Sequence, residues 1–207
     1  MLRRFQVAGL VFSLELPEDF PAADQLHNYD PFLCPDPAPC HSERSEESLF
    51  SLTLSDKAPE TAPREPLFRA KEESGEPVVS LDRTPTGYFA EFSPLPGAPV
   101  CGQLDMDGDF RTGRLYASGR PSDQAFAVNN ALMLLFAFAS APFRALEMHA
   151  SVVTHGGRGF LFLGRSGTGK STHSRLWLRH IEGTELLNDD NPVLRVVDGT
   201  VRVYGTP

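Results

Sequence analysis

The sequence predicts an α+β protein in which a mainly antiparallel β region, residues 1–120, precedes an α/β region, residues 121–207. The first 100 residues hold 14 of the 18 prolines and only 4 of the 17 glycines, and their net charge is −9. Several segments there alternate apolar and polar residues with a period of two, which is typical of half-buried strands. After residue 159, an apolar strand, a glycine-rich loop and a helix-compatible run follow one another directly.

Length, charge and cysteine content limit the class of protein. The 207 residues carry a net charge of −8, which argues against nucleic acid or an anionic membrane as a partner. The three cysteines form no regular framework, so we expect a reducing compartment, the cytoplasm. The apolar run 131–139 is far shorter than the roughly 20 residues of a membrane-spanning helix. The sequence leaves open whether the protein forms a homo-oligomer.

Strands and a long insertion are expected in the first region. Residues 5–16 alternate with a slip near Gly9, which fits an antiparallel strand pair or one bulged strand. Residues 33–66 are dense in Pro, Ser and Glu and predict a disordered insertion. Residues 88–92 and 110–118 read as strands. The Asp-rich stretch between them predicts a hairpin turn, because it lacks the glutamate that closes a calcium loop.

The second region begins with a buried helix over residues 122–140, capped by Ser122 or Asp123. Strands are expected over residues 146–154 and 160–163, and the helix should pack against them. A final hairpin joins residues 193–197 to 200–204 through Asp198-Gly199, a strong turn dipeptide. Its two arginines, Arg195 and Arg202, are either solvated or directed toward a ligand.

Residues 164–171 read GRSGTGKS and match G-x-x-x-x-G-K-[ST] at every fixed position, directly after the apolar strand and before the helix. Glycines let backbone N–H groups surround phosphate oxygens at a helix N-terminus. The motif predicts ATP and Mg²⁺ as ligands, with Lys170 on the β- and γ-phosphates and the Ser171 hydroxyl on Mg²⁺. The candidate nucleotide-binding residues are Gly164, Ser166, Gly167, Thr168, Gly169, Lys170, Ser171 and Thr172. The alternative is a glycine-rich turn with a chance lysine.

Two carboxylates and a histidine complete the candidate site. An apolar strand ends in Asp189 and Asp190, where a P-loop protein places one aspartate on Mg²⁺ and can use a second to accept a proton from the attacking hydroxyl. The alternative is a simple turn, for which the composition NDDNP is well suited. His149 lies fifteen residues before Gly164, and alone it would be interpreted as a core histidine.

Three segments together resemble the HPr kinase/phosphorylase and ATP-dependent phosphoenolpyruvate carboxykinase superfamily, and most of all its HPr-kinase-like proteins. They read HAS from His149, GFLFLGRSGTGKST, and ELLNDDNPVLR, within residues 145–207. The resemblance implies a partial P-loop kinase core, with Asp189 and Asp190 catalytic, Asp190 with Ser171 on the metal, and His149 near the transferred phosphoryl group. Such proteins continue through further strands, so the resemblance also implies a core that is C-terminally truncated.

The leading hypothesis is an ATP-dependent phosphotransferase, a kinase that transfers a phosphoryl group from Mg-nucleotide to a hydroxyl of a protein serine or a small metabolite. Its activity would depend on the missing C-terminal part. The alternative is a non-catalytic nucleotide-binding or interaction module, the remnant of such a kinase. No residue in the sequence selects the acceptor.

Overall fold

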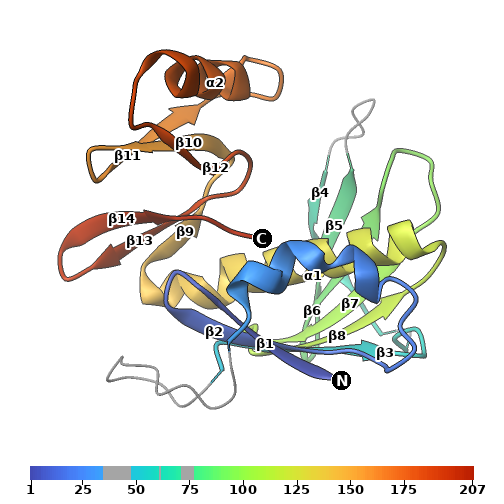
Figure 1. Cartoon of the computed structure of the whole chain (residues 1–207). Coiled ribbons are helices and arrows are strands. Elements are labelled where there is room, and N and C mark those ends of the chain that lie inside the picture. The colour runs from blue at the N-terminus through green and yellow to red at the C-terminus, as the bar shows by residue number, and fades with distance from the viewer. Residues whose placement is uncertain (35–47, 61, 71–76) are drawn as a thin grey trace. The chain divides into compact units, whose positions relative to one another are not determined.

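The structure is a computed structural model that describes residues 1–34, 48–60, 62–70 and 77–207 (Figure 1). The chain forms two compact units, the first comprising Met1–Gln6 and Val11–Ala139 and the second Val7–Leu10 and Ser140–Pro207. Strands predominate in the first unit, and the chain contains few helices. This confirms the α+β class with a β-rich N-terminal region.

The first unit is built on a mixed eight-stranded sheet with the order β1-β2-β3-β8-β7-β6-β5-β4. Strand β3 runs parallel to both of its neighbours, β2 and β8, while β4 to β8 pair antiparallel in succession. The strands are β1 (Leu2–Val7), β2 (Leu10–Glu15), β3 (Ser51–Ser55), β4 (Glu65–Arg69), β5 (Val78–Thr84), β6 (Gly87–Ser93), β7 (Gly102–Asp107) and β8 (Thr112–Ala117). Two short 3₁₀ helices, η1 (Ala23–Gln25) and η2 (His27–Phe32), lie between β2 and β3 in the chain.

One predicted hairpin is present in this sheet, and a second joins other strands than expected. Ala8 and Gly9 join β1 to β2 with φ angles of 52° and 75°, the backbone of a tight two-residue turn. The slip near Gly9 therefore marks a strand pair and not a bulge.

The Asp-rich turn joins β7 to β8. The Asp107 carboxylate accepts hydrogen bonds from the backbone N–H groups of Arg111 (2.8 Å) and Thr112 (3.1 Å). A turn was predicted in this stretch, between strands 88–92 and 110–118, but its first part, Gly102–Asp107, forms strand β7, which was not predicted.

Helix α1 (Pro121–Ser140) packs on the apolar face of this sheet. A Cβ atom added to Gly113 of β8 would lie 2.7 Å from Leu135 Cδ1, and one added to Gly102 would lie 2.8 Å from the Cβ of Ala127. The sequence-based division grouped this helix with the glycine-rich loop, but its contacts place it in the first unit. The reason is that the alternating strands β6 to β8 offer a complete apolar face, which the helix covers.

Among the described residues, one helical stretch, Pro121–Phe143, is long and apolar enough to cross a membrane by length and composition. In the structure, its residues Ala127, Val128, Ala131 and Leu135 are completely buried. A helix of a globular core has the same composition, because it also contacts apolar surroundings on more than one side.

The prediction of disorder over residues 33–66 is wrong where the structure describes that segment. Strand β3 lies inside it, with Leu52 fully buried between neighbouring strands. Phe50 is also buried, and its ring stacks on Phe12 with centroids 4.9 Å apart. The period-two pattern of residues 50–55 outweighs the Pro- and Ser-rich composition around it. Residues 35–47 and 61 of the prediction lie outside the described residues.

The second unit contains two three-stranded sheets, with the orders β11-β10-β12 and β14-β13-β9, and one α-helix (Figure 1). Trp177 of the helix packs on Phe160 and Phe162, with ring centroids 4.8 and 5.7 Å away. On the opposite face of the same sheet, a Cβ added to Gly159 would collide with Val203 of the second sheet. The elements are η3 (Ala141–Phe143), β9 (Ala145–Glu147), β10 (Ala150–His155), β11 (Arg158–Leu163), α2 (Lys170–His180), β12 (Glu185–Asn188), β13 (Val193–Val197) and β14 (Thr200–Tyr204).

Two expectations for this unit need correction and one is confirmed. The predicted strand 146–154 is two strands, β9 and β10, which belong to different sheets and are separated by Met148 and His149. The final hairpin forms as predicted, with positive φ at Asp198 (50°) and Gly199 (74°). Arg195 is half-buried and not simply solvated, because its guanidinium donates to the carbonyl oxygen of Ala8 at 2.7 Å. Arg202 is exposed.

Candidate functional site

Strand topology brings the candidate residues to one edge of the β11-β10-β12 sheet. Strand β10 lies in the middle and runs antiparallel to both neighbours, so the ends of β11 and β12 lie beside the start of β10. In the register, Leu163 pairs with Ala150 and Asn188 pairs with Val152. The glycine-rich loop, the two aspartates and His149 are the chain segments that directly adjoin these pairs.

The loop has the backbone that its glycines predict. Gly167 and Gly169 have φ angles of 76° and 91°, a region that side chains with a Cβ rarely adopt. Nothing lies within 4 Å of a Cβ added to either one, so conformation and not space requires glycine there. The Thr168 hydroxyl donates to the carbonyl oxygen of Arg165 at 2.8 Å and closes the loop on itself. Residues 164–169 are exposed and accessible to a ligand.

Helix α2 begins directly after this loop with its N-terminus uncapped. Its N-cap, Gly169, offers no side-chain hydrogen bond, and the described first turn contains no acidic residue. Backbone N–H groups of a first helical turn lack partners within the helix, and the helix dipole favours an anion there. The backbone N–H groups of Lys170, Ser171 and Thr172 are therefore available as hydrogen-bond donors at the end of the loop.

Lys170, His149 and Asp190 form a chain of polar contacts. The Lys170 ammonium donates to His149 Nε2 at 2.8 Å and to the carbonyl oxygen of Gly164 at 3.0 Å. Because Nε2 accepts this bond, the imidazole proton is assigned to Nδ1, which lies 3.1 Å from Asp190 Oδ1. The side chains of His149 and Asp190 are 53% and 72% exposed. His149 is thus a surface residue of the site and not a core histidine.

Asp189 is held by the buried Ser151, which is itself in contact with the buried Ser174. The Ser151 hydroxyl donates to Asp189 Oδ1 at 2.5 Å, so the contact between the two serine hydroxyls is donated by Ser174. Ser151 and Ser174 are 0% and 1% exposed. This network ties the end of β12 to β10 and α2. Sequence reasoning missed Ser174, although its spacing of three residues from Trp177 places both on one face of the helix.

The chain turns at Asn188–Asp190, as its composition predicts. Asn188 Oδ1 accepts a hydrogen bond from the backbone N–H of Asp190 at 3.0 Å, which is the geometry of an Asx turn. The carbonyl oxygen of Asp190 accepts one from the Ala150 N–H at 2.9 Å. The turn and the site are therefore compatible, because the turn directs both aspartates toward the edge.

Glu147 is a further acidic residue that sequence reasoning missed. It lies on β9 opposite Val193. Burial, and secondarily the charge of Asp190, raise the pKa of its carboxyl from 4.5 to about 7. Its Oε2 atom is buried and has no hydrogen-bond partner among the described residues. The sequence feature that could have identified Glu147 is a single carboxylate in an otherwise apolar strand.

Among the described residues, no group of three or more His, Cys, Asp or Glu side chains is placed to hold a metal ion. Ser171 and Asp190, the predicted Mg²⁺ ligands, provide a hydroxyl and a carboxylate. These hard oxygen donors suit Mg²⁺, which usually keeps several waters and takes only one or two carboxylates beside nucleotide phosphates. The hydroxyl of Ser171 and the carboxylate of Asp190 are therefore compatible with a Mg²⁺ ion that binds together with a nucleotide.

No protein-family model matches the chain, and no curated protein matches it. The resemblance to the HPr-kinase-like proteins stays a prediction from the residues. The function is therefore inferred from the site.

Proposed function

We propose that the second unit binds ATP with Mg²⁺ and acts as a phosphotransferase core of the HPr-kinase-like type. The observation that carries the proposal is the contact chain Lys170–His149–Asp190 beside the glycine-rich loop. A chance glycine-rich turn has no reason to meet a histidine that precedes one strand and an aspartate that follows another at one sheet edge.

In this proposal the loop N–H groups and the start of α2 hold the nucleotide phosphates. The Lys170 ammonium, which bonds His149 and the loop carbonyls in the structure, turns to the β- and γ-phosphates when they arrive. Its three donors and flexible stem permit that exchange. Mg²⁺ on Ser171 and Asp190 would neutralise charge on the phosphate oxygens.

The two aspartates differ in how they are held, which favours different tasks. Asp189 is fixed by the buried Ser151, whereas Asp190 is mainly exposed and, among the described residues, its side chain contacts His149. Asp190, which His149 orients by donating from Nδ1, would hold Mg²⁺, and Asp189 would accept the proton of the acceptor hydroxyl. The acceptor is a hydroxyl of a protein serine or of a small molecule.

One observation favours the second candidate, a nucleotide-binding module without turnover. His149 and Asp190 are both more than half exposed, and phosphoryl transfer to a hydroxyl other than water requires that water be kept out. A unit that binds nucleotide in such an open site would not transfer its phosphoryl group efficiently.

Calorimetry with ATP, ADP and Mg²⁺ tests nucleotide binding. The wild-type protein should bind at millimolar nucleotide or better, and Lys170→Ala should weaken binding by at least tenfold. Arg179→Ala, which removes an exposed charge near the other end of α2, is the matched control and should bind normally. No affinity in the wild type, or equal affinity in Lys170→Ala, would contradict the proposal.

Turnover separates the two candidates. Sustained ADP production that is lost in Asp190→Asn supports the phosphotransferase. Binding without ADP production in the presence of hydroxyl acceptors supports the non-catalytic module.

A further inference from the structure

The first unit has a polar sheet face opposite α1. Arg114 of β8, Asp105 of β7 and Phe89 of β6 pair directly across the strands, so all three lie on this face. The same row continues to Thr53 on β3 and Asp82 on β5. Phe89 is the single aromatic side chain of this row.

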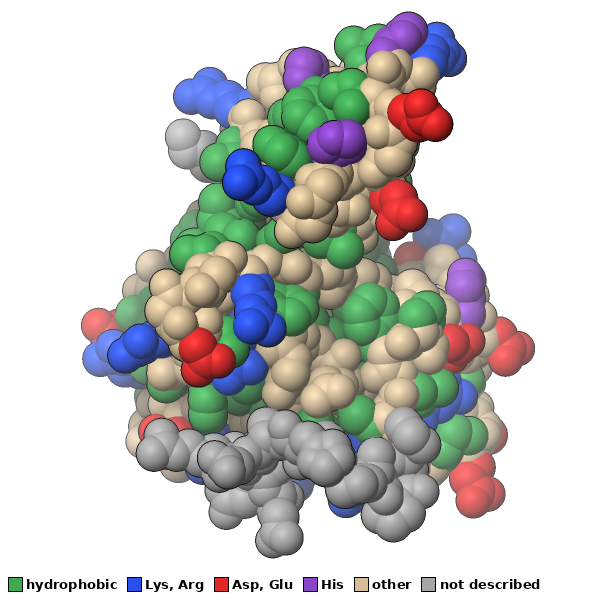
Figure 2. Space-filling view, turned by 60° about the vertical axis from the view of Figure 1, so that its left-hand side comes forward, with side chains coloured by type: hydrophobic (Ala, Val, Ile, Leu, Met, Phe, Trp, Pro, Cys, Tyr) green, Lys and Arg blue, Asp and Glu red, His purple; other side chains and the backbone are tan. Residues whose placement is uncertain are grey.

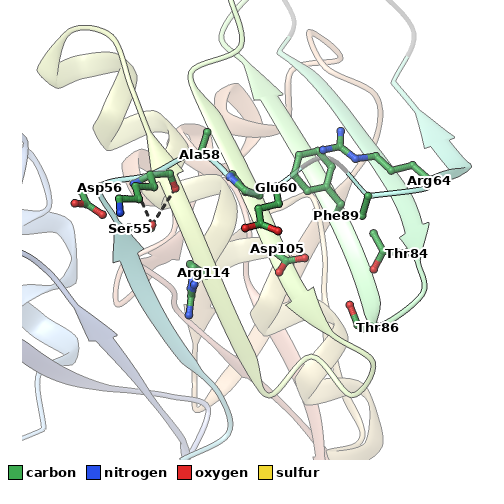
Figure 3. Close-up of a pocket in the computed structure, with 13 residues that line it drawn as sticks. Ser55, Asp56, Ala58, Glu60, Arg64, Thr84, Thr86, Phe89, Asp105 and Arg114 are labelled. Carbon is green, nitrogen blue, oxygen red and sulfur yellow. Dashed lines mark hydrogen bonds between the residues drawn. The ribbon is translucent and has the colours of Figure 1, made fainter.

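The described residues between β3 and β4 cross this polar face. We call these residues, 56–60 and 62–64, the strap. Strands β3 and β4 lie on either side of β5 to β8 in the sheet, and Figure 3 shows the strap passing over the strands between them. The Arg64 guanidinium lies 3.4 Å from the centroid of the Phe89 ring and 3.9 Å from Glu91. The end of the strap is thereby held on the sheet.

A cavity of about 500 Å³ lies between the strap and the polar face. Among the described residues, three acidic and three basic side chains line its walls. They are Asp56, Glu60 and Asp105, and Lys57, Arg64 and Arg114. A second cavity of about 470 Å³ shares Thr86, Asp105 and Arg114 with it. Each of these volumes lies within the range of sites that bind small organic ligands.

Asp105 and Arg114 of the cavity are available to a ligand. Asp105 and Arg114 face each other in register, yet no ion pair or hydrogen bond joins their side chains in the described part of the chain. Figure 3 shows Glu60 of the strap together with Asp105 and Arg114 of the sheet among the residues that line the cavity. In addition, the Thr84 hydroxyl at the cavity wall is buried with no partner among the described residues.

We propose that this cavity binds a small zwitterion, a molecule with an ammonium and a carboxylate group such as a free amino acid. Glu60 and Asp105 provide oxygens for the ammonium, and Arg114 provides a planar donor pair for the carboxylate. A simple anion or cation would meet three like charges as well as three opposite ones.

Calorimetry of the full chain with each of the common amino acids tests the proposal. At least one amino acid should bind at millimolar concentration or better. Its N-acetyl derivative, which lacks the ammonium, and its amide, which lacks the carboxylate, should each bind at least tenfold more weakly. No binding by any amino acid, or equal binding by either derivative, overturns the proposal.

Variants that each remove one charge test which side chains contact the ligand. Asp105→Asn and Arg114→Gln alter exposed side chains and should each weaken binding at least tenfold while circular dichroism stays that of the wild type. Asp109→Asn and Arg83→Gln remove exposed charges outside the cavity and should bind normally. Lys170→Ala should also bind the amino acid normally, whatever its effect on nucleotide. Unchanged affinity in both Asp105→Asn and Arg114→Gln contradicts the proposal.

Discussion

Both units expose some large apolar side chains, such as Phe68 of the first at 55%, but the first unit buries most of its own whereas the second buries only a few. Leu52, Leu104 and Leu115 of the first unit are fully buried beneath α1. In the second unit, Leu163 is 60% exposed and Val201 is 65% exposed. Figure 2 shows such hydrophobic side chains open at the surface, near histidines. The first unit thus depends on packing and the second more on polar contacts and turns.

Because of this difference, the residues that stabilise the fold by packing are mostly not those of the candidate site. The residues of the candidate site lie in the second unit, and most of them are exposed and held by hydrogen bonds. Core substitutions should therefore act mainly in the first unit. Trp177 is the single tryptophan of the chain and packs within the second unit, so its fluorescence reports on that unit.

The largest effect is expected from Leu115→Ala. It leaves a cavity in the fully buried face of β8 and should lower the free energy of unfolding by about 2–5 kcal/mol. Urea unfolding followed by circular dichroism, which is dominated by the strands of the first unit, measures the loss. A change below about 1 kcal/mol would mean that this face is not the packed core.

The next effect depends on pH and concerns Glu147. Its pKa is raised from 4.5 to about 7 in the folded protein, so the folded state binds more protons than the unfolded chain between these values. Its contribution to stability is therefore complete below about pH 4.5 and is lost as pH rises through about 7. In protein without nucleotide or metal, Glu147→Gln should remove this loss.

Unfolding curves followed by Trp177 fluorescence measure this dependence. At pH 8, Glu147→Gln should exceed the wild type by up to about 3 kcal/mol, while the two proteins should be similar near pH 4.5. Glu185→Gln changes an exposed glutamate of the same unit and is the control. A wild-type stability that rises between pH 5 and 8 while Glu147→Gln follows the same curve would refute the assignment.

Ser151→Ala should have a smaller effect on the second unit. It removes the hydroxyl that joins Ser174 to Asp189, and a buried hydrogen-bonding group left without its partner costs about 1–3 kcal/mol. Fluorescence-detected unfolding measures the loss. A matched change, Ser166→Ala in the exposed loop, should leave stability unchanged, and equal losses in both variants would contradict the role of the network.

The smallest effect is expected from Val201→Thr. This residue of β14 is 65% exposed, so stability should change by no more than about 0.5 kcal/mol. A loss near that of Leu115→Ala would show that Val201 is covered in solution, and the contrast between the units would then be smaller than the structure indicates.

Local requirements of the backbone could be predicted from the sequence. Gly167, Gly169 and the turn dipeptide Asp198-Gly199 need positive φ angles, and the structure has them. These features depend on a few neighbouring residues, so a single sequence reveals them. The glycine-rich loop, its strand and its helix were found for the same reason.

Features that depend on distant parts of the chain could not be predicted. Strand β3 pairs in parallel with β2 and β8, and its composition-based interpretation as disorder failed because the partners are not adjacent in sequence. The division of residues 146–154 between two sheets was missed for the same reason. Likewise, the Ser151–Ser174–Asp189 network joins three elements, and only the folded chain brings them together.

Hydrogen–deuterium exchange with and without Mg-ATP tests whether nucleotide binds at one sheet edge of the second unit. We expect slower exchange in residues 164–172 and 188–190 and no change in β5 to β8 of the first unit. Lys170→Ala should abolish that protection. Protection confined to the first unit, or no protection at saturating nucleotide, would show that nucleotide does not bind at this edge.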